Sequence, residues 1–460
     1  MKAEKIPVVN GGLPLLGHAI PFMTDPIAFL KKAHKKLGSI FSFKLPGKNV
    51  VMLIGPEHNK FVFEQTDKLL SIEEGYTFFQ NMFSPDFFYF GGFEAYKKQR
   101  DIVLPCFKNT QMPNYLDVMM FETEQFMKSL GTSGSFDLTE TFGPLVMKIA
   151  AHSFLGKDFK DKIGDSIFED FRQFSEGMDP VIPGWVPLPK FKRSKKAKEK
   201  LYDNLLVLVK ERREHPKNPP DFLQTLATST YPDGEQVPDD VVIDLILLLV
   251  WAGHETTAGH ISWVLIDLLQ NQEYLNSVLE EQQEVISATT AFSMETMKSL
   301  KKIEWAIKET ERLHPVAYIL LRNANVSFER NGFHVPKGSS VFISPALTHQ
   351  MPEVFNDPEI YNPLRFSEPK NLNYDLIGFG GGLHRCAGVN FAYLEMKLIM
   401  TFLLHHYDFE LITKKPKPVK GPVTKWPASP TIVSYKKKEN VSSITKKNLK
   451  EQTNNTCPYH

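Results

Sequence analysis

One cysteine of the chain lies in a segment suited to hold a metal ion as a thiolate. The ten residues Phe379 to Gly388 read FGGGLHRCAG, and Cys386 is their cysteine. The glycines Gly380 to Gly382 let the backbone turn and approach a flat cofactor more closely than a Cβ atom would permit. An apolar helical run begins directly after Gly388, so the sulfur is expected near a helix N-terminus, which favours a negative thiolate. Taken alone, a cysteine beside glycines is more often a small buried residue.

A second candidate site is a polar cluster within the most apolar helical run. The run LILLLVW is followed at once by AGHETT, which occupies residues 252–257. A glycine inside a helix costs about 1 kcal/mol relative to alanine, and buried polar groups cost more unless they are paired. A solvated notch or a kink would explain the cluster by itself. Beside the cysteine segment, a functional role is the better explanation.

A third cluster is the segment ETER, residues 309–312. Glu309 and Arg312 are three residues apart on one predicted helix, so they share a face and can pair. Such a pair alone indicates only a solvated ion pair.

Together these clusters resemble the cytochrome P450 superfamily over roughly residues 13–435. The pattern Phe-x2-Gly-x3-Cys-x-Gly is similar to its haem-binding loop, whose cysteine ligates the haem iron and favours O–O cleavage. The resemblance implies haem b as the cofactor, Cys386 as the axial iron ligand and Phe379 packed beside the sulfur. It also implies that backbone N–H groups after Cys386 hydrogen-bond the sulfur.

The segment AGHETT resembles the oxygen-activation motif of the same superfamily. On that resemblance Ala252 and Gly253 make room over the iron, and Thr256 supplies a hydroxyl to the oxygen chemistry. Glu255 would relay protons from solvent. His254 is expected to face away and to pack elsewhere.

The other predicted contacts retain the haem. Glu309 and Arg312 resemble the E-x-x-R motif, which implies a buried network completed by Arg365. Partners for the haem propionates are expected at four cationic or hydrogen-bonding residues: Tyr76, Arg100, Arg322 and His384. His384 stands where most members carry Arg and sterol 14α-demethylases carry His, so the resemblance is greatest to sterol 14α-demethylase-like members. Glu255 departs from those enzymes, which typically carry His before Thr.

The elements that must position these residues are mainly helical. Periodicity predicts four long helices, the last of which crosses the domain: 26–36, 115–130, 194–214 and 239–269. Strands are expected at 39–45 and 49–55, with a β meander over 323–345. Residues 180–193 are too rich in proline for a helix and form either a packed loop or a substrate-access lip. The predicted fold class is mainly α with a smaller β portion; on the resemblance it is the P450 fold, a triangular helical prism with a long central helix.

The composition is that of an ordinary globular protein, with 460 residues, 42% of them hydrophobic and 23% charged. One haem domain is predicted over residues 1–436, followed by a disordered tail over residues 437–460. A net charge of +1 offers no general attraction for nucleic acid. Three widely separated cysteines, Cys106, Cys386 and Cys457, point to a reducing compartment, the cytoplasm. Neither a signal peptide nor a transmembrane anchor is predicted.

The leading hypothesis is a haem-thiolate monooxygenase that inserts one oxygen atom of O2 into a large apolar substrate, such as a sterol, terpenoid, retinoid or fatty acid. Electrons would come from a separate ferredoxin or flavodoxin system or an NADPH reductase. A basic surface for that partner is predicted at four residues: Lys97, Lys98, Arg100 and Lys108. The alternatives are a sterol 14α-demethylase proper, a haem-thiolate isomerase or dehydratase acting on a peroxide, and a haem sensor without catalysis.

Overall fold

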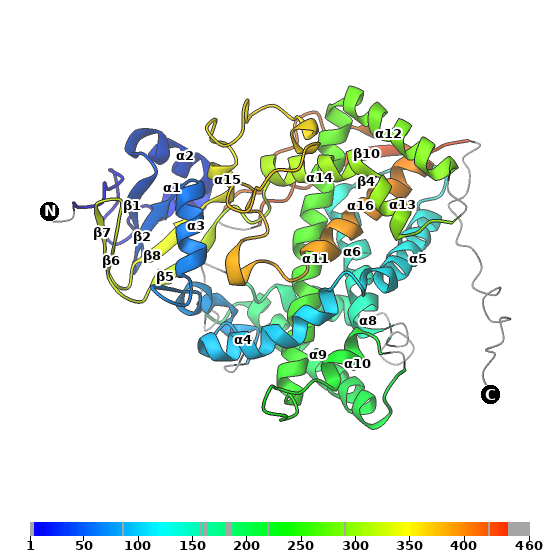
Figure 1. The fold of residues 1–460 in the computed structure, drawn as a ribbon, viewed down its shortest axis with the longest axis horizontal. Helices are drawn as coiled ribbons and strands as arrows, with labels where there is room; N and C mark the ends of the chain where they lie inside the picture. The colour runs from blue at the N-terminus through cyan, green and yellow to red at the C-terminus, as the bar shows by residue number, and fades with distance from the viewer. Residues whose placement is uncertain are drawn as a thin grey trace.

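A long central helix, α11 (Asp239–Gln270), crosses the molecule (Figure 1). The computed structural model describes residues 4–84, 87–156, 159, 164, 166–179, 186–218, 220–288, 291–421 and 424–439. Helix α11 is apolar around most of its circumference because neighbouring helices cover it on several sides, chiefly α6 (Leu138–Leu155), α9 (Pro189–Glu214) and α14 (Lys301–Leu313). It is long and apolar enough to span a bilayer, but 61% of its most apolar window is buried inside the protein, as in a core helix.

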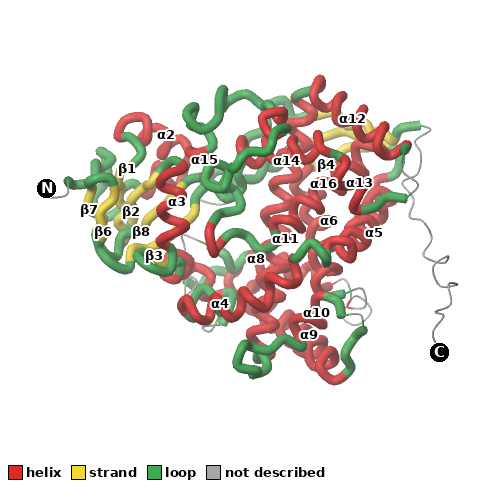
Figure 2. The backbone as a smooth tube through the Cα atoms, viewed as in Figure 1, coloured by secondary structure: helices red, strands yellow, loops and turns green. Residues whose placement is uncertain are grey.

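Further helices pack near α11, while α1 (Ala19–Thr24), α2 (Pro26–Leu37), α3 (Pro56–Gln65) and α15 (Pro345–Thr348) lie beside the strands on the N-terminal side (Figure 2). The bounds of the others are α4 Gly92–Val103, α5 Met112–Leu130, α8 Ser166–Ser175, α10 Phe222–Ala227, α12 Gln272–Ser287, α13 Met294–Ser299 and α16 Val389–His406. Short 3-10 turns lie at Glu73–Asn81, Leu104–Phe107, Pro363–Phe366 and Gly382–His384.

The strands gather mainly on the N-terminal side of the molecule (Figure 2). Their bounds are β1 Ile40–Leu45, β2 Lys48–Leu53, β3 Leu70–Ser71, β4 Ser133–Asp137, β5 Leu320–Ala324, β6 Phe328–Arg330, β7 Phe333–Val335, β8 Ser340–Ile343, β9 Tyr407–Leu411 and β10 Ile432–Lys437. Within the described residues they form a five-stranded sheet in the order β1-β2-β8-β5-β3, a three-stranded sheet β4-β10-β9 and the hairpin β6-β7. Only the β2–β8 pairing in these sheets is parallel.

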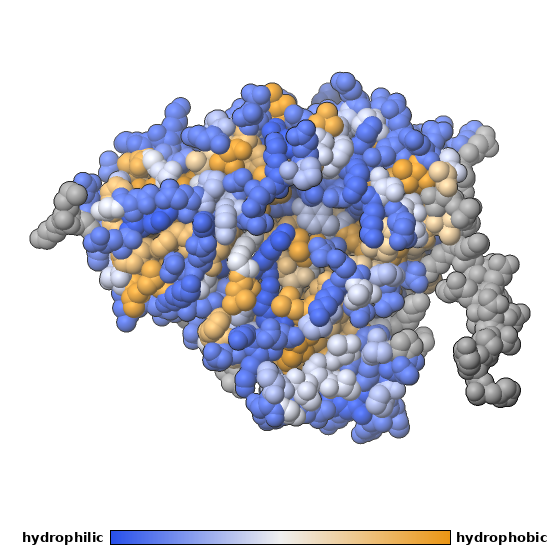
Figure 3. Space-filling view, viewed as in Figure 1, coloured by the Kyte–Doolittle hydropathy of each residue, from blue (hydrophilic) through white to orange (hydrophobic). Residues whose placement is uncertain are grey.

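The five-stranded sheet is buried on both faces. Along β2, Val50 and Met52 enter one apolar cluster, whereas Val51 and Leu53 enter another, as the two-residue period of a strand requires. The largest cluster surrounds α11. Hydrophilic side chains cover much of the face in Figure 3, with apolar side chains between them, which is usual for a folded globular surface.

The predicted fold class is confirmed, as are the main predicted elements. The helix expected from residue 26 is α2, the two early strands are β1 and β2, and the central helix ends one residue beyond its expected end. One boundary was wrong: α9 begins at Pro189, inside the segment expected to be non-helical. Proline is tolerated there because the first helical residue needs no N–H donor.

Two sequence predictions fall on residues outside the described part of the chain. Residues 180–185 of the predicted loop or access lip are among them, and so are residues 440–460 of the predicted tail, with Cys457. The tail cannot begin as early as residue 437, because Lys437 pairs with Tyr407 as the last residue of β10.

Candidate active site

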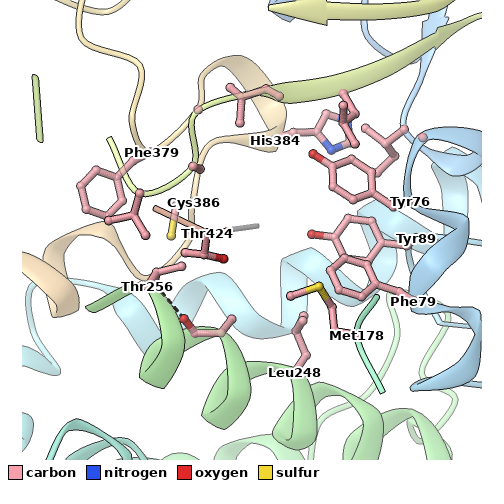
Figure 4. Close-up of a pocket in the computed structure, with 18 of the residues that line it drawn as sticks. Tyr76, Phe79, Tyr89, Met178, Leu248, Thr256, Phe379, His384, Cys386 and Thr424 are labelled. Atoms are coloured by element: carbon pink, nitrogen blue, oxygen red, sulfur yellow. Dashed lines mark hydrogen bonds between the residues drawn. The ribbon is translucent and has the colours of Figure 1, made fainter. Parts of the chain in front are cut away.

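A cavity of about 1120 Å³ opens between α11, the loop before α16 and the five-stranded sheet. Its wall draws on residues as far apart in sequence as Ala19 and Thr424. Figure 4 shows Cys386, Thr256 and His384 around this space, with aromatic side chains opposite. Ordinary ligand pockets hold about 300–1,000 Å³, so this cavity has room for more than one small molecule.

The thiol of Cys386 faces the cavity. Cys386 is exposed, but to this interior space and not to bulk water, and burial therefore raises the pKa of its thiol above the ordinary value. The N–H of Gly388, the N-cap of α16, hydrogen-bonds the sulfur and opposes that rise, as do the charges of Arg100 and Arg385. The N–H of Cys386 itself donates to the carbonyl of Phe379 at 2.9 Å. The backbone contact and the neighbouring positive charges thus offset part of the effect of burial on this thiol.

The three consecutive glycines do not all approach the cavity, and the expectation of close approach to a cofactor is wrong for two of them. Gly380, at φ +71°, lines the cavity. A Cβ atom at Gly381 would lie 2.4 Å from the ring of Phe63, and one at Gly382 would lie 2.9 Å from the Phe63 carbonyl. These two glycines are therefore required by packing against α3.

On the other side, α11 presents Ala252, Gly253 and Thr256 to the cavity. The Thr256 hydroxyl donates to the carbonyl of Ala252 at 2.9 Å (Figure 4). A Cβ atom at Gly253 would meet its nearest neighbour, Ala150, at an ordinary 3.6 Å. Packing therefore does not demand a glycine at residue 253, and its effect is to leave room in the cavity.

The two ionisable residues of the same helix turn lie outside the cavity lining. His254 packs beside Gly143 of α6, 3.5 Å from where a Cβ atom there would stand, and burial lowers its pKa to about 4. Burial raises the pKa of Glu255 to about 7. Glu255 is therefore partly protonated near neutral pH, one residue before the hydroxyl that does face the cavity.

The four predicted propionate partners all line the cavity. Three are already held by protein groups: Arg100 Nη2 donates to the Arg385 carbonyl at 2.7 Å, Arg322 Nε donates to the Thr66 hydroxyl at 2.8 Å, and His384 Nε2 lies 2.6 Å from an Asp67 carboxylate oxygen. Tyr76 instead stacks on Tyr89 and Phe79, with ring centroids 5.2 and 5.9 Å away. Because Arg100 points inward, its assignment to an exposed basic surface was wrong; Lys97, Lys98 and Lys108 are exposed.

Behind the cysteine loop, the structure brings Glu309, Arg312 and Arg365 together. Arg312 donates to both carboxylate oxygens of Glu309, at 2.7 and 2.8 Å, and Arg365 Nε lies 3.0 Å from the same carboxylate. The Glu309 and Arg312 side chains are completely buried. Arg312 also donates to the carbonyls of His349 and Pro358, so its charge is met on several sides.

An aromatic wall was missed in the sequence. Five ring-bearing residues line the cavity and contact one another: Tyr76, Phe79, Phe88, Tyr89 and Trp251. Four of them come from one segment, residues 76–90, whose density of Phe and Tyr was the available signal. The partners Asp67 and Tyr96 of His384 were also missed, because each belongs to an element remote in sequence.

The residues present fit a haem. One thiol opens into the cavity with an N–H on its sulfur, which is the donor set of a thiolate-ligated iron. Among the residues that line the same space, Arg100, Arg322 and His384 suit two propionates, while apolar and aromatic side chains suit the macrocycle.

Comparison with known proteins agrees with this geometry. The family model described as Cytochrome P450 matches residues 7–434. The chain belongs to the cytochrome P450 family. Its cofactor is haem b, and it is a haem-thiolate monooxygenase that takes electrons from a redox partner and acts on an apolar substrate. The predictions of family, cofactor and enzyme class are thereby confirmed.

Several relatives share most of their length with this P450. A sterol 14-demethylase of Arabidopsis thaliana is 30% identical, over 89% of this chain and 87% of its own. A sterol 14alpha-demethylase of Mycobacterium tuberculosis is 28% identical, over 96% of this chain and 100% of its own. Among solved structures, the retinoic acid-bound cyanobacterial CYP120A1 has a TM-score of 0.86 at 26% identity, covering 95% of this chain and 100% of that one.

Proposed function

We propose that this P450 oxidises a large, rigid, sterol-like substrate, with Cys386 as the axial thiolate and one haem domain that extends from the predicted 1–436 through Lys437, the end of β10. The supporting observation is that Cys386 and Thr256, from two different elements, face one cavity large enough for a haem and a polycyclic substrate. Relatives that cover most of the chain are named sterol 14-demethylases, and a wall of stacked rings suits a flat hydrocarbon skeleton.

Each site residue has a distinct part in this proposal. When bound, the haem supplies the O2 and electron-transfer chemistry. Cys386 holds it, and Arg100, Arg322, His384 and Tyr76 orient it through the propionates. The Thr256 hydroxyl holds a proton at Oγ1 facing the cavity.

Proton delivery rests on Glu255 in the same proposal. Because its carboxyl lies outside the cavity lining, a proton reaches the cavity through the Thr256 hydroxyl or a water molecule. Its pKa of about 7 lets it give and regain that proton near neutral pH. An acid at residue 255 favours simple oxygen insertion over sterol demethylation, since the resemblance places His there in the demethylases.

The test of the ligand assignment is a pair of cysteine variants. Cys386→Ser should lose the red-shifted Soret band that thiolate ligation gives the reduced carbon monoxide complex. Cys106→Ser is the matched control, because Cys106 is buried with its sulfur near the Ile102 carbonyl, and it should keep that band. Retention of the band in Cys386→Ser would refute the assignment.

Spectral titration tests the substrate class. Sterols should displace water from the iron and shift its spin state at lower concentrations than terpenoids or fatty acids do. A retinoid is the second candidate, because the structural neighbour was solved with retinoic acid bound. A retinoid shift at much lower concentration than any sterol would replace the sterol proposal, whereas turnover with peroxide alone would favour an isomerase or dehydratase.

The partner of this proposal is an acidic electron carrier, a ferredoxin, flavodoxin or reductase, in the cytoplasm. The exposed Lys97, Lys98 and Lys108 offer positive charge near α4, whose inner face contacts the cysteine loop through Arg100. Raising the salt concentration should slow haem reduction by the carrier, because screening weakens the attraction of exposed charges. A rate of haem reduction that does not change with salt would contradict this surface. So would a double variant, Lys97→Gln with Lys108→Gln, that is reduced as fast as the wild type.

A further inference from the structure

A second buried carboxyl, Glu311 of α14, lies beside the cysteine loop at the cavity wall and takes no part in the Glu309 network. It is 4% exposed. Its Oε1 accepts a hydrogen bond from the N–H of Gly378 at 3.0 Å, and its Oε2 accepts one from the hydroxyl of Tyr393. The carboxyl therefore joins α14 to both the start of the cysteine loop and the helix α16 that follows it.

The Glu311 side chain packs tightly against the backbone of Gly378. A Cβ atom at residue 378 would lie 2.6 Å from Glu311 Cγ, so the glutamate packs directly on the loop backbone. A buried carboxyl is costly without partners, and here both oxygens are used. Glu311 therefore fixes the position of the residue immediately before Phe379.

Through Tyr393, Glu311 is also linked to the ring of Phe379. The Tyr393 ring packs against the Phe379 ring, with centroids 5.3 Å apart and planes inclined at 35°. Phe379, which lies beside Cys386 in Figure 4, gives its carbonyl to the Cys386 N–H at 2.9 Å. Both hydrogen bonds of Glu311 therefore act on Phe379. One fixes its neighbour Gly378, and the other fixes Tyr393, whose ring packs on the Phe379 ring.

We propose that Glu311 is a positioning residue for Cys386, which fixes Phe379 through Gly378 and Tyr393 and so keeps the sulfur on the haem iron as a thiolate. The inference deepens the proposed function and rests on Cys386 being the ligand. It assigns Glu311 a part separate from Glu309 and Arg312, which retain the fold. The contacts predict a spectroscopic effect, because a loop that relaxes displaces the Phe379 carbonyl that holds the Cys386 N–H, and so displaces the sulfur.

The experiment compares Glu311→Leu with Glu311→Gln in haem-loaded protein. Leucine removes both hydrogen-bond acceptors, so most of the reduced carbon monoxide complex should move to the Soret position of thiol ligation, and the reduction potential should rise as the anionic ligand is lost. Glutamine keeps an oxygen for the Gly378 N–H and an amide for the Tyr393 oxygen. It should therefore restore the thiolate band and a potential close to that of the wild type.

Two control variants distinguish a specific effect on the position of Cys386 from a general loss of packing around α14. Glu304→Gln changes another part-buried carboxyl of α14, one paired with Lys308 and Lys397 instead of the loop, and should leave the band and potential unchanged. Tyr393→Phe keeps the ring on Phe379 but loses the hydroxyl, and should shift part of the complex. A wild-type band in Glu311→Leu, or an equal shift in Glu304→Gln, overturns the proposal.

The outcomes remain decisive if Glu311→Leu yields no haem-loaded protein. Tyr393→Phe then carries the test, and a wild-type band and potential in that variant overturn the proposal. Failure of the proposed function looks different, because Cys386→Ser would then keep the thiolate band whatever the Glu311 variants do.

Discussion

At the scale of single residues, Thr256 is the group whose hydroxyl can be tested apart from its size. Its Oγ1 faces the cavity and is held by the Ala252 carbonyl. Thr256→Ala removes the proton held there, so several-fold more of the electrons consumed should end as peroxide or water instead of product. The measurement is the ratio of product formed to reductant consumed. Thr256→Ser keeps the hydroxyl and should stay near the wild-type ratio, and full coupling in Thr256→Ala would contradict the role.

At this scale the sequence predicts the residues that stand in short motifs, including the Glu309–Arg312 pair, but not Asp67 or Glu311, which hold motif residues in place. Cys386 and Thr256 stand in short motifs, so local spacing was enough to find them. Asp67 lies 317 residues from its partner His384, and Glu311 lies 67 residues from Gly378. No local pattern marks such pairs, because only the folded chain brings them together.

At the scale of elements, the buried Glu309–Arg312 pair should matter far more than an exposed pair of the same spacing. Glu309→Ala leaves the Arg312 charge buried and unpaired, at a cost of about 3–5 kcal/mol, with loss of haem. Glu169→Ala is the matched control, since Glu169 and Arg172 form an exposed i, i+3 pair on α8, and it should cost about 1 kcal/mol or less. Haem content and urea unfolding measure both. Equal effects would contradict the buried network.

The contact between the cysteine loop and α3 gives a second prediction at this scale. Gly381→Ala adds a methyl group 2.4 Å from the Phe63 ring, and overpacking of this kind costs about 1–3 kcal/mol. The backbone there is extended, at φ −162°, so the cost is one of space only. Gly381→Ala should therefore weaken haem binding, and adding Phe63→Leu to the same chain should restore it. A double variant no better than Gly381→Ala would show that the ring is not the obstacle.

Elements themselves were predictable where they form continuous apolar runs. The central helix is a long run of this kind, and β1 and β2 are short ones rich in Val, Ile and Phe. The start of α9 was missed because proline reads as a helix breaker, although its place at the first helical residue makes it compatible with the helix. The order of the five-stranded sheet was not predictable, since β2 pairs with β8, about 290 residues later in the chain.

At the scale of the whole molecule, two buried acids should give stability a dependence on pH. The folded-state pKa values of Glu255 and Glu311 are both about 7, against 4.5 when exposed. The folded protein therefore binds more protons than the unfolded chain between about pH 4.5 and 7. Each acid lowers stability as pH rises through that window, by on the order of 3 kcal/mol per acid. Buried histidines such as His260, whose pKa falls to about 4, act in the opposite direction.

The comparison of a variant with the wild type isolates one acid from these opposing groups. Glu255→Gln should gain stability relative to the wild type as pH rises from about 5 to about 8, because the amide never acquires a charge. Urea unfolding at the two pH values measures the difference. A gain that is the same at both values would mean that Glu255 keeps an ordinary pKa in the folded protein.

Residues that line the cavity are far apart in sequence, so the cavity can form only late in synthesis of the chain. Ala19 and Thr424 line the same space, and β2 cannot pair with β8 until β8 has been synthesised. A ribosome adds about 5–20 residues per second, so the two ends of this wall are made many seconds apart. Haem cannot be captured during most of synthesis, and the aromatic segment 76–90 stays uncovered until α11 and the cysteine loop have emerged. Slower chain elongation should therefore lengthen the exposure of this segment and increase the share of the protein lost to aggregation before haem is bound.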